Sequence, residues 1–333
     1  MRQKLRTSIP AAIGILVLIL DTRTALNGAY QGLELCIRTV IPSLLPFFVL
    51  STVLTSALIG EKISFLRPLG RLMGVDHGAE SLILVGMLGG YPAGAQSVSQ
   101  AYRNGSISKQ AAQRMVAFCN LAGPAFLFGI VAGKFSENSA AWKLWGIHLL
   151  SAILVAMLLP GRSGNQSTLN TGKLIALPEA LHRSLKTMAL VCGWIILFRV
   201  ILAFLSLWFL WMLPIPAQVA LTGLLELSNG CCDLGRIENE PLRFVIAAGL
   251  LSFGGLCVSM QTASVSQGLS MKKYFIGKAL QTLLSVLFAA IVQIQQLHFS
   301  AIFWISLVVL IGLLVNFLHK KQKRYSISKP IGV

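Results

Sequence analysis

The chain has 333 residues, of which 55% are apolar and only 12% are charged, and its mean hydropathy is +0.74. This composition excludes an ordinary soluble globular protein and predicts an all-α polytopic membrane protein. The net charge of +17 at pH 7 would suit a nucleic-acid-binding protein, but the basic residues fall in short clusters between apolar segments. The positive-inside rule places basic residues there, so we expect contact with membrane lipid and no nucleic-acid partner.

The N-terminal apolar run Ile9–Leu20 has two interpretations. Its length fits the core of a signal peptide, but no clear small-residue cleavage site follows it. The alternative, which we favour, is an uncleaved first span that residues 22–29 extend. Further spans are predicted at residues 39–59, 113–133, 142–159, 187–213, 241–265, 275–294 and 301–318, which gives about eight transmembrane helices.

Two other apolar segments are too short to cross a hydrocarbon core of about 30 Å. Ser81–Met87 gives way to Gly89 and Gly90 after two turns, and Ala217–Gly230 ends in a polar sequence that begins at Glu226. We predict that each segment forms a re-entrant helical hairpin. Irregular backbone at membrane depth must be satisfied by protein or by a water-filled cavity, so such segments favour a binding site.

The order of long, truncated and interrupted segments recurs along the chain, which predicts two halves that form an inverted repeat. Residue identity between the halves is slight, so chance similarity among apolar helices is the alternative. The predicted division is residues 1–34 for the N-terminal span, 35–160 for the first half, 161–186 for a cytoplasmic linker, 187–296 for the second half and 297–333 for a final span with a basic tail.

The basic residues support this topology with both termini in the cytoplasm. The groups assigned to the cytoplasm are Arg2, Lys4 and Arg6; Lys62, Arg67 and Arg71; Arg103, Lys109 and Arg114; Arg162, Lys173, Arg183 and Lys186; Lys272, Lys273 and Lys278; and the tail from Lys320 to Lys329. The outer side receives only Arg23, Arg38, Lys134, Lys143, Arg236 and Arg243. This excess on one side agrees with the positive-inside rule. We expect the connector from Arg103 to Arg114 to be solvated or to face lipid.

Glu226 is the one carboxylate predicted to lie in the membrane interior, where an uncompensated charge costs about 2.5 to 3.5 kcal/mol. We predict that it couples transport to a proton or Na⁺, or that it pairs with Arg199 in the preceding span. A hydrated carboxylate near the outer interface is the alternative. The candidate solute-binding residues are Tyr91, Gln96, Ser97, Asn120, Gly123, Pro124, Ser228, Asn229, Ser259, Gln261 and Thr262. For each of these, helix packing is the alternative role.

Two motifs carry a resemblance to a known family. The Gly-Tyr-Pro-x-Gly-Ala core at residues 90–95 and the Asn-x-x-Gly-Pro run at residues 120–124 resemble the nucleoside-recognition, or Gate-domain, superfamily, and most closely its sporulation integral membrane proteins of the YlbJ type. The resemblance implies a protein of the bacterial cytoplasmic membrane that is related to concentrative nucleoside transporters. In spore formers this group is linked to moving dipicolinic acid, a small aromatic dicarboxylate, into the developing spore, which implies the forespore membrane. The segment from Glu226 to Cys232 has no residue-by-residue match in the family.

These observations predict a secondary transporter or permease for a small polar or anionic organic solute, either dipicolinic acid-like or nucleoside-like, that binds between the hairpin tips. The alternative is a non-transporting membrane scaffold for spore or envelope assembly, which would need no polar groups converging inside the membrane. The sequence shows no catalytic constellation, nucleotide-binding motif or metal-ligand spacing, so we expect no enzyme and no cofactor. Assembly into a homo-oligomer is a further arrangement to test.

Overall fold

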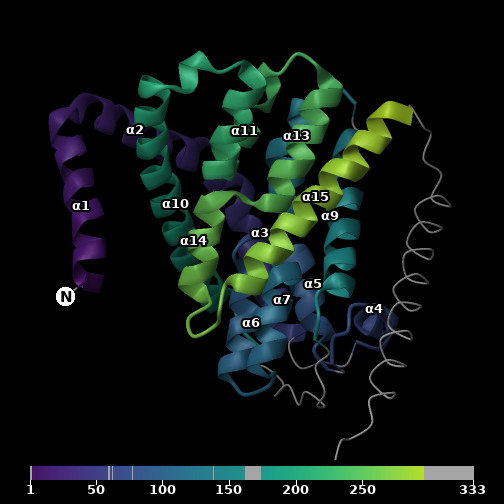
Figure 1. The fold of residues 1–333 in the computed structure, drawn as a ribbon. Helices are drawn as coiled ribbons and strands as arrows, with labels where there is room; N and C mark the ends of the chain where they lie inside the picture. The colour runs from purple at the N-terminus through teal and green to yellow at the C-terminus, as the bar shows by residue number, and fades with distance from the viewer. Residues whose placement is uncertain are drawn as a thin grey trace, which may run out of the picture.

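The computed structural model describes residues 2–58, 61, 63–76, 78–137, 139–161 and 174–295, and every regular element in these ranges is helical. Its α-helices are α1 (Arg2–Leu20), α2 (Thr22–Leu35), α3 (Ile41–Leu58), α4 (Arg67–Leu72), α5 (Glu80–Gly89), α6 (Ala93–Arg103), α7 (Lys109–Cys119), α8 (Pro124–Phe126), α9 (Ser139–Leu158), α10 (Leu177–Trp208), α11 (Ile215–Leu225), α12 (Leu227–Asp233), α13 (Glu240–Phe253), α14 (Gly255–Val265) and α15 (Lys272–Gln295). Figure 1 shows their arrangement.

Six helical segments of the described chain are long and apolar enough to cross a membrane. They are Thr22–Leu58, Lys109–Lys134, Ser139–Leu158, Leu177–Trp208, Glu240–Val265 and Lys272–Gln293. The prediction of an all-α polytopic membrane protein is therefore confirmed. Of the other two expected spans, the first corresponds to α1, whose apolar part Ser8–Leu20 is shorter than these six, and the last, at residues 301–318, lies outside the described residues.

The N-terminal helices differ from the expected single span. The Asp21 side chain accepts a hydrogen bond from the Thr24 backbone N–H at 3.0 Å, which caps a new helix that begins at Thr22. Residues 22–29 therefore belong to α2 and do not extend the first span. Helix α2 continues through a π-helical turn at Cys36–Val40 into α3, and α1 projects away from the main body (Figure 1).

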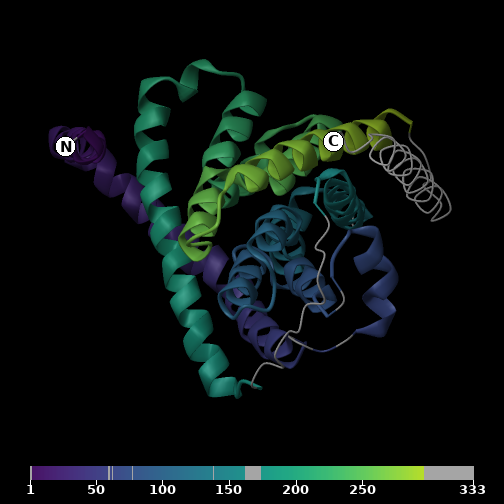
Figure 2. The same cartoon turned by 60° about the horizontal axis from the view of Figure 1, so that its bottom comes forward.

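Helices α2 and α10 cross in close contact, as Figure 2 shows. Glycines make this approach possible, because a Cβ atom at Gly28 would lie only 2.9 Å from Ala203 Cβ, and one at Gly32 only 2.9 Å from Ile196 Cα. Helix α10 already begins at Leu177, so the C-terminal part of the expected linker at residues 161–186 is helical; residues 162–173 lie outside the description.

The first predicted hairpin consists of α5 and α6, joined by a turn in which Gly90 has a φ of 72°. The two helices pack with Gly86 facing Gly94, and a Cβ atom at either glycine would collide with the carbonyl oxygen of Cys119, at the end of α7. The backbone of this hairpin therefore lies directly on that helix. Its re-entrant position in a bilayer stays a prediction.

The segment after this hairpin is interrupted just before Pro124. The Ser108 side chain caps α7 through the Ala111 backbone N–H at 3.2 Å, the helix ends at Cys119, and residues 120–123 are not helical. Pro124 then begins α8, a position that proline favours because its missing N–H would have no helical partner.

The second half contains a matching arrangement. Helices α11 and α12 form a second hairpin with Gly223 against Gly230, and the following segment is interrupted between α13 and α14 at Gly254 and Gly255, whose φ angles are 82° and 80°. In Figure 1, α5 and α6 lie in the lower part of the molecule and α11 in the upper part, so the two hairpins approach the middle from opposite ends.

Arg114 is buried, although we expected its segment to be solvated or to face lipid. Its guanidinium donates hydrogen bonds to the carbonyl oxygens of Met73 at 2.6 Å, Gly74 at 3.1 Å and Leu159 at 3.2 Å, and also to that of Ala156. Arginine offers five N–H donors, which explains why one side chain can bind loop carbonyls from several segments. Arg114 thus fixes α7 to the end of α9 and to the loop after α4.

Candidate functional site: a cavity between the two hairpin tips

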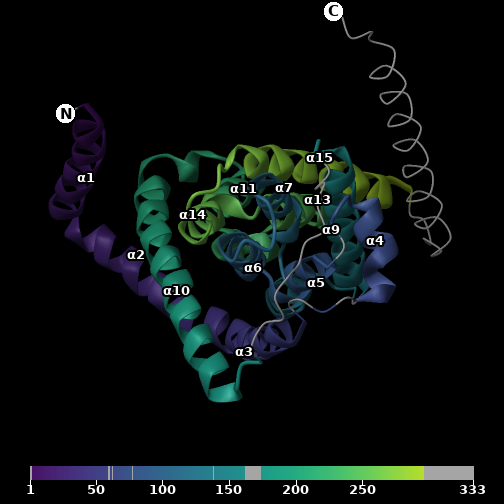
Figure 3. The same ribbon diagram turned by 90° about the horizontal axis from the view of Figure 1, so that it is seen from below.

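A cavity that is partly open to solvent lies where the two hairpin tips meet, and its empty volume with the open part included is about 510 Å³. The first tip contributes Gly89, Gly90 and Tyr91, and the second contributes Glu226, Leu227 and Ser228. The helix breaks and α14 contribute Gly123, Ala125, Phe126, Val258 and Gln261. The rest of the wall is apolar and comes from α3, which lies beside α5 in Figure 3, and from α10. The residues are Leu44, Phe47, Phe48, Val191 and Ile195. One side of the cavity is therefore polar and the other is apolar.

Tyr91 connects the first hairpin tip to the break in the second half. Its hydroxyl donates a hydrogen bond to the Leu251 carbonyl oxygen at 3.0 Å. A Cβ atom at Gly254 would lie 3.1 Å from this hydroxyl oxygen, and Gly254 has a φ of 82°, so both the close approach and the backbone conformation favour glycine. The ring of Tyr91 thus occupies space that the break between α13 and α14 provides.

Asn120 and Thr262 connect the first helix break to α14 behind the cavity. Asn120 is fully buried; its Nδ2 donates to Thr262 Oγ1 at 2.8 Å, and its Oδ1 accepts from the Ala95 backbone N–H at 3.4 Å. Thr262 in turn donates to the Val258 carbonyl oxygen at 2.7 Å. One amide side chain therefore holds the first hairpin, the first break and α14 together.

Glu226 is buried at the second hairpin tip, with 1% of its surface exposed. Its carboxylate accepts hydrogen bonds from the backbone N–H groups of Ser228 at 3.0 Å and Asn229 at 2.7 Å, and from Asn229 Nδ2 at 2.7 Å. These contacts cap α12 and favour the ionised carboxylate. Glu226 also lines the cavity, so it can meet a solute or a cation there.

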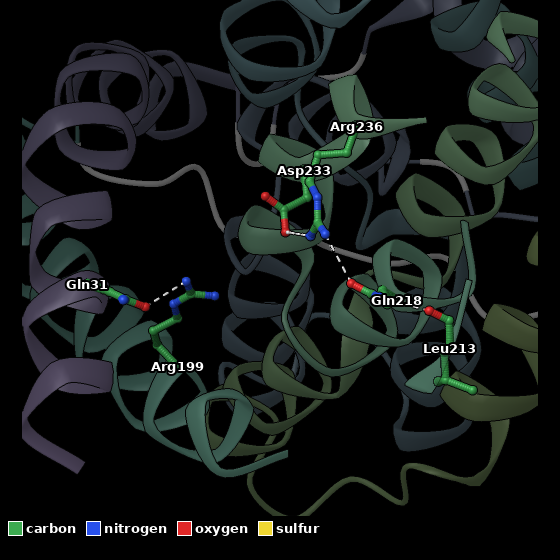
Figure 4. Close-up of polar contacts among 6 residues, drawn as sticks. All are labelled: Gln31, Arg199, Leu213, Gln218, Asp233 and Arg236. Atoms are coloured by element: carbon green, nitrogen blue, oxygen red, sulfur yellow. Dashed lines mark hydrogen bonds and ion pairs between the residues drawn. The ribbon is translucent and has the colours of Figure 1, made fainter. Parts of the chain in front are cut away.

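The expected pairing of Arg199 with Glu226 is wrong. Arg199 lies on the face of α10 that packs against α2, and its guanidinium donates to Gln31 Oε1 at 2.8 Å, as Figure 4 shows. The same figure shows Arg236 bonded to Gln218 and Asp233 near the end of the second hairpin. None of the ion pairs among the described residues includes Glu226.

The predicted site residues fall into two groups. Those that line the cavity are Tyr91, Gly123, Glu226, Ser228 and Gln261. Those outside its wall are Gln96, Ser97, Asn120, Pro124, Asn229, Ser259, Thr262 and Arg199. Gln96 is exposed on α6 because that side of the helix faces away from the hairpin partner. Ser259 bonds its own helix at the Gly255 carbonyl oxygen, so it supports packing.

Lys278 is the main residue that we misplaced, because we assigned it to the cytoplasmic basic residues together with Lys272 and Lys273. It is 1% exposed inside α15, and its Nζ donates to Tyr91 Oη at 3.2 Å, the Asn120 carbonyl oxygen at 2.7 Å and Gln281 Oε1 at 3.0 Å. The sequence held a signal for it: Lys278, Gln281, Thr282 and Ser285 recur at the spacing of one helix face within an otherwise apolar run.

His148 lies next to Lys278 in the same buried network. Its Nε2 accepts from the Ala122 backbone N–H at 3.0 Å, so Nδ1 carries the proton of the neutral ring and donates to Ser252 Oγ at 3.2 Å. Ser252 Oγ donates to Ser285 Oγ at 2.6 Å, and Ser285 Oγ donates to Ser151 Oγ at 2.7 Å. This chain of hydrogen bonds joins α9, α13 and α15 next to the first break.

Comparison with known proteins gives one informative similarity. The chain is 27% identical to the sporulation integral membrane protein YlbJ of Bacillus subtilis (strain 168), over an alignment of 316 residues that covers 80% of this chain and 77% of the relative. No family model matches the chain, and no solved structure matches it. The similarity and the apolar helices together support an integral membrane protein that resembles a sporulation protein of the YlbJ type.

Proposed function

We propose that the chain is a secondary transporter or permease, related to the Gate-domain superfamily, that moves a small polar or anionic organic solute through the cavity between its hairpin tips. The supporting observation is that two hairpins from opposite ends of the molecule, and the broken segments that follow them, contribute to one cavity. Alternating access commonly uses such broken helices around a central site. The similarity to a sporulation membrane protein supports a role in sporulation.

The walls of the cavity favour a small aromatic solute with polar substituents. Phe47, Phe48 and Phe126 offer apolar surface for a ring, and Tyr91 and Gln261 offer hydrogen-bonding groups on the other side. A pyridine dicarboxylate such as dipicolinate, or a nucleoside, has this combination of a flat ring and polar groups.

The scaffold alternative expects the polar residues of the two halves to lie far apart. Glu226 and Gln261 line the same cavity, and Asn120 bonds Thr262, the neighbour of Gln261. This convergence is what a solute site needs, whereas a scaffold has no use for it. The proposal assigns Glu226 to the solute or to a coupling cation, because its carboxylate reaches the cavity without a charged partner among the described residues.

The test is solute uptake by the purified protein in liposomes. Labelled dipicolinate and uridine are offered with an inward proton gradient, an inward Na⁺ gradient or no gradient. We expect at least one solute to enter faster than into protein-free liposomes. Glu226→Gln should lower that uptake about tenfold or more, because losing a hydrogen bond to a charged group costs about 1.5 to 3 kcal/mol.

Glu179→Gln is the matched control, because Glu179 is exposed on α10 and pairs only at the surface with Arg183. It should transport as the wild type does. If the folded wild-type protein moves neither solute under any gradient, the transport proposal is wrong and the scaffold alternative is preferred. Unchanged uptake by Glu226→Gln would remove Glu226 from the mechanism.

A further inference from the structure

Lys278 is a buried cation without a carboxylate partner. It is 1% exposed in the second turn of α15, and none of the ion pairs among the described residues includes it. An ammonium group inside a membrane is costly, and ionisable residues at such positions usually serve ion or proton pathways. The transport proposal so far makes no use of this group.

Three neutral oxygen atoms satisfy the ammonium completely. Its three N–H groups reach Tyr91 Oη, the Asn120 carbonyl oxygen and Gln281 Oε1 at 3.2, 2.7 and 3.0 Å, and Nζ lies 5.0 Å from the centre of the Tyr91 ring. The Asn120 carbonyl is free to accept because α7 ends there, and the negative end of a helix favours a cation. The charged state is therefore well accommodated.

The neutral amine of Lys278 can also form hydrogen bonds with all of its polar groups at this position. It has two N–H groups, which suit Asn120 and Gln281, and one lone pair, which can accept a hydrogen bond from the Tyr91 hydroxyl. Tyr91 would then turn its hydrogen from the Leu251 carbonyl oxygen, 3.0 Å away, toward Nζ. Loss of a proton from Lys278 therefore removes the bond between the first hairpin tip and the end of α13.

The ionisable groups near Lys278 come from its own helix and from its neighbours; on α15 itself, the buried phenol of Tyr274 lies one turn before it. Helix α15 packs on α7, α9 and α13. From α9 the group that faces Lys278 is His148, which reaches it through Gln281; from the hairpin tip it is Tyr91. The charged residues of α13, Glu240 and Arg243, lie in its first turn, whereas Tyr91 bonds its last turn. On α7, the guanidinium of Arg114 points to other segments and is bound to the carbonyl oxygens of Leu159 and Met73.

We propose that Lys278 is a proton-binding site that couples solute movement to a proton gradient, with Tyr91 connecting it to the cavity. The inference rests on the proposed transport function. In the step, one Nζ–H bond breaks and its proton forms a new O–H bond on Tyr91, while the original hydroxyl proton of Tyr91 leaves for water in the cavity, which Tyr91 lines. The ammonium becomes an amine and Tyr91 stays neutral. Reprotonation restores the bond from Tyr91 to Leu251. Glu226 remains available to the solute, so the two buried charges have separate roles.

The test separates solute exchange from gradient-driven uptake in proteoliposomes. Labelled dipicolinate or uridine is exchanged against the same unlabelled solute without a gradient, and is then accumulated under an inward proton gradient. The wild type should do both, with gradient-driven uptake about tenfold above uptake without a gradient. Lys278→Arg keeps the positive charge but cannot release the proton, so it should exchange solute within about threefold of the wild type and lose the response to the gradient. Lys272→Arg, at the exposed start of α15, is the control and should keep that response.

A second variant covers the case in which Lys278→Arg fails to fold. Gln281→Glu places a carboxylate where the Gln281 amide oxygen now lies 3.0 Å from Nζ. An opposite charge at this distance favours the ammonium, so the midpoint of the pH profile of uptake should move up by about one pH unit or more. A purely structural lysine would leave that midpoint in place.

Each outcome decides one of the two proposals. A wild type that exchanges no solute contradicts the transport function itself. A wild type that exchanges solute but ignores the proton gradient overturns only the role of Lys278. The same holds if Lys278→Arg still follows the gradient, or if Gln281→Glu leaves the pH midpoint unchanged.

Discussion

Asn120 and Thr262, which lie 142 positions apart in the chain, share a buried hydrogen bond of 2.8 Å. Each belongs to the interrupted segment of its own half, so this bond joins the two halves next to the cavity. The carbonyl oxygen of the same asparagine accepts from Lys278. The contribution of the Asn120 side chain to the stability of the protein can therefore be measured directly.

Asn120→Ala should destabilise the protein by about 1 to 3 kcal/mol or more, because Thr262 Oγ1 and the Ala95 backbone N–H lose a buried partner. Asn104→Ala is the control, because Asn104 is exposed at the end of α6 and bonds only through its backbone. Thermal unfolding in detergent, followed with a thiol-reactive dye, reports the change because most of the free cysteines are buried. Equal melting temperatures for both variants would show that the junction contributes little.

Gly94→Ala should destabilise the first hairpin by about 1 to 3 kcal/mol, because its Cβ atom would collide with the Cys119 carbonyl oxygen. Gly193→Ala is a matched control in α10, where no atom lies within 4 Å of the new Cβ. Alanine is the better helix former, so the control should keep or slightly raise the melting temperature. A Gly94→Ala protein as stable as the wild type would contradict the close packing of hairpin and helix.

Val258→Phe should block solute uptake, because Val258 lines the cavity and the larger side chain fills part of its volume. The variant should still elute from a size-exclusion column as the wild type does, since overpacking costs only about 1 to 3 kcal/mol. Met260→Phe, two residues along the same helix and 41% exposed, should transport normally. Uptake that survives Val258→Phe would place the solute path elsewhere.

Arg114→Lys should weaken the attachment of α7 to α9 and to the loop after α4, although the positive charge is kept. The guanidinium reaches four carbonyl oxygens on two sides of the helix, and an ammonium has only three N–H donors at one point. We expect faster cleavage by trypsin after Arg71, in the last turn of α4 next to that loop. Arg103→Lys, at the solvent-exposed end of α6, should leave the cleavage rate unchanged.

The architecture of the site was largely predictable, since its signals are local. A short apolar run marks each hairpin, ending in glycines in the first and in a polar sequence from Glu226 in the second, and non-helical residues near Asn120 and Gly254 interrupt the segments that follow. The pairing partner of Arg199 was not predictable in this way. It depends on which face of α10 meets α2, and the two glycines of α2 that allow the contact lie far away in the sequence.

Lys278 shows why the charge pattern alone can mislead. It follows Lys272 and Lys273 closely, and a count of basic residues places all three on the cytoplasmic side. In the structure α15 begins at Lys272, so Lys278 is more than a turn inside the helix and faces α7 and α9. Helical periodicity of the polar residues would have separated it from its neighbours, because it groups Lys278 with Gln281 and Ser285.

The glycine contact between the first hairpin and α7 restricts how the molecule can change shape. Where main chain touches main chain at Gly86 and Gly94, there are no rotamers to readjust, so small sliding displacements meet immediate steric clash. Hairpin and helix should then travel as one rigid block during a transport cycle. The contacts that break must be those made by side chains, and the single bond from Tyr91 to Leu251 is the easiest of them to exchange.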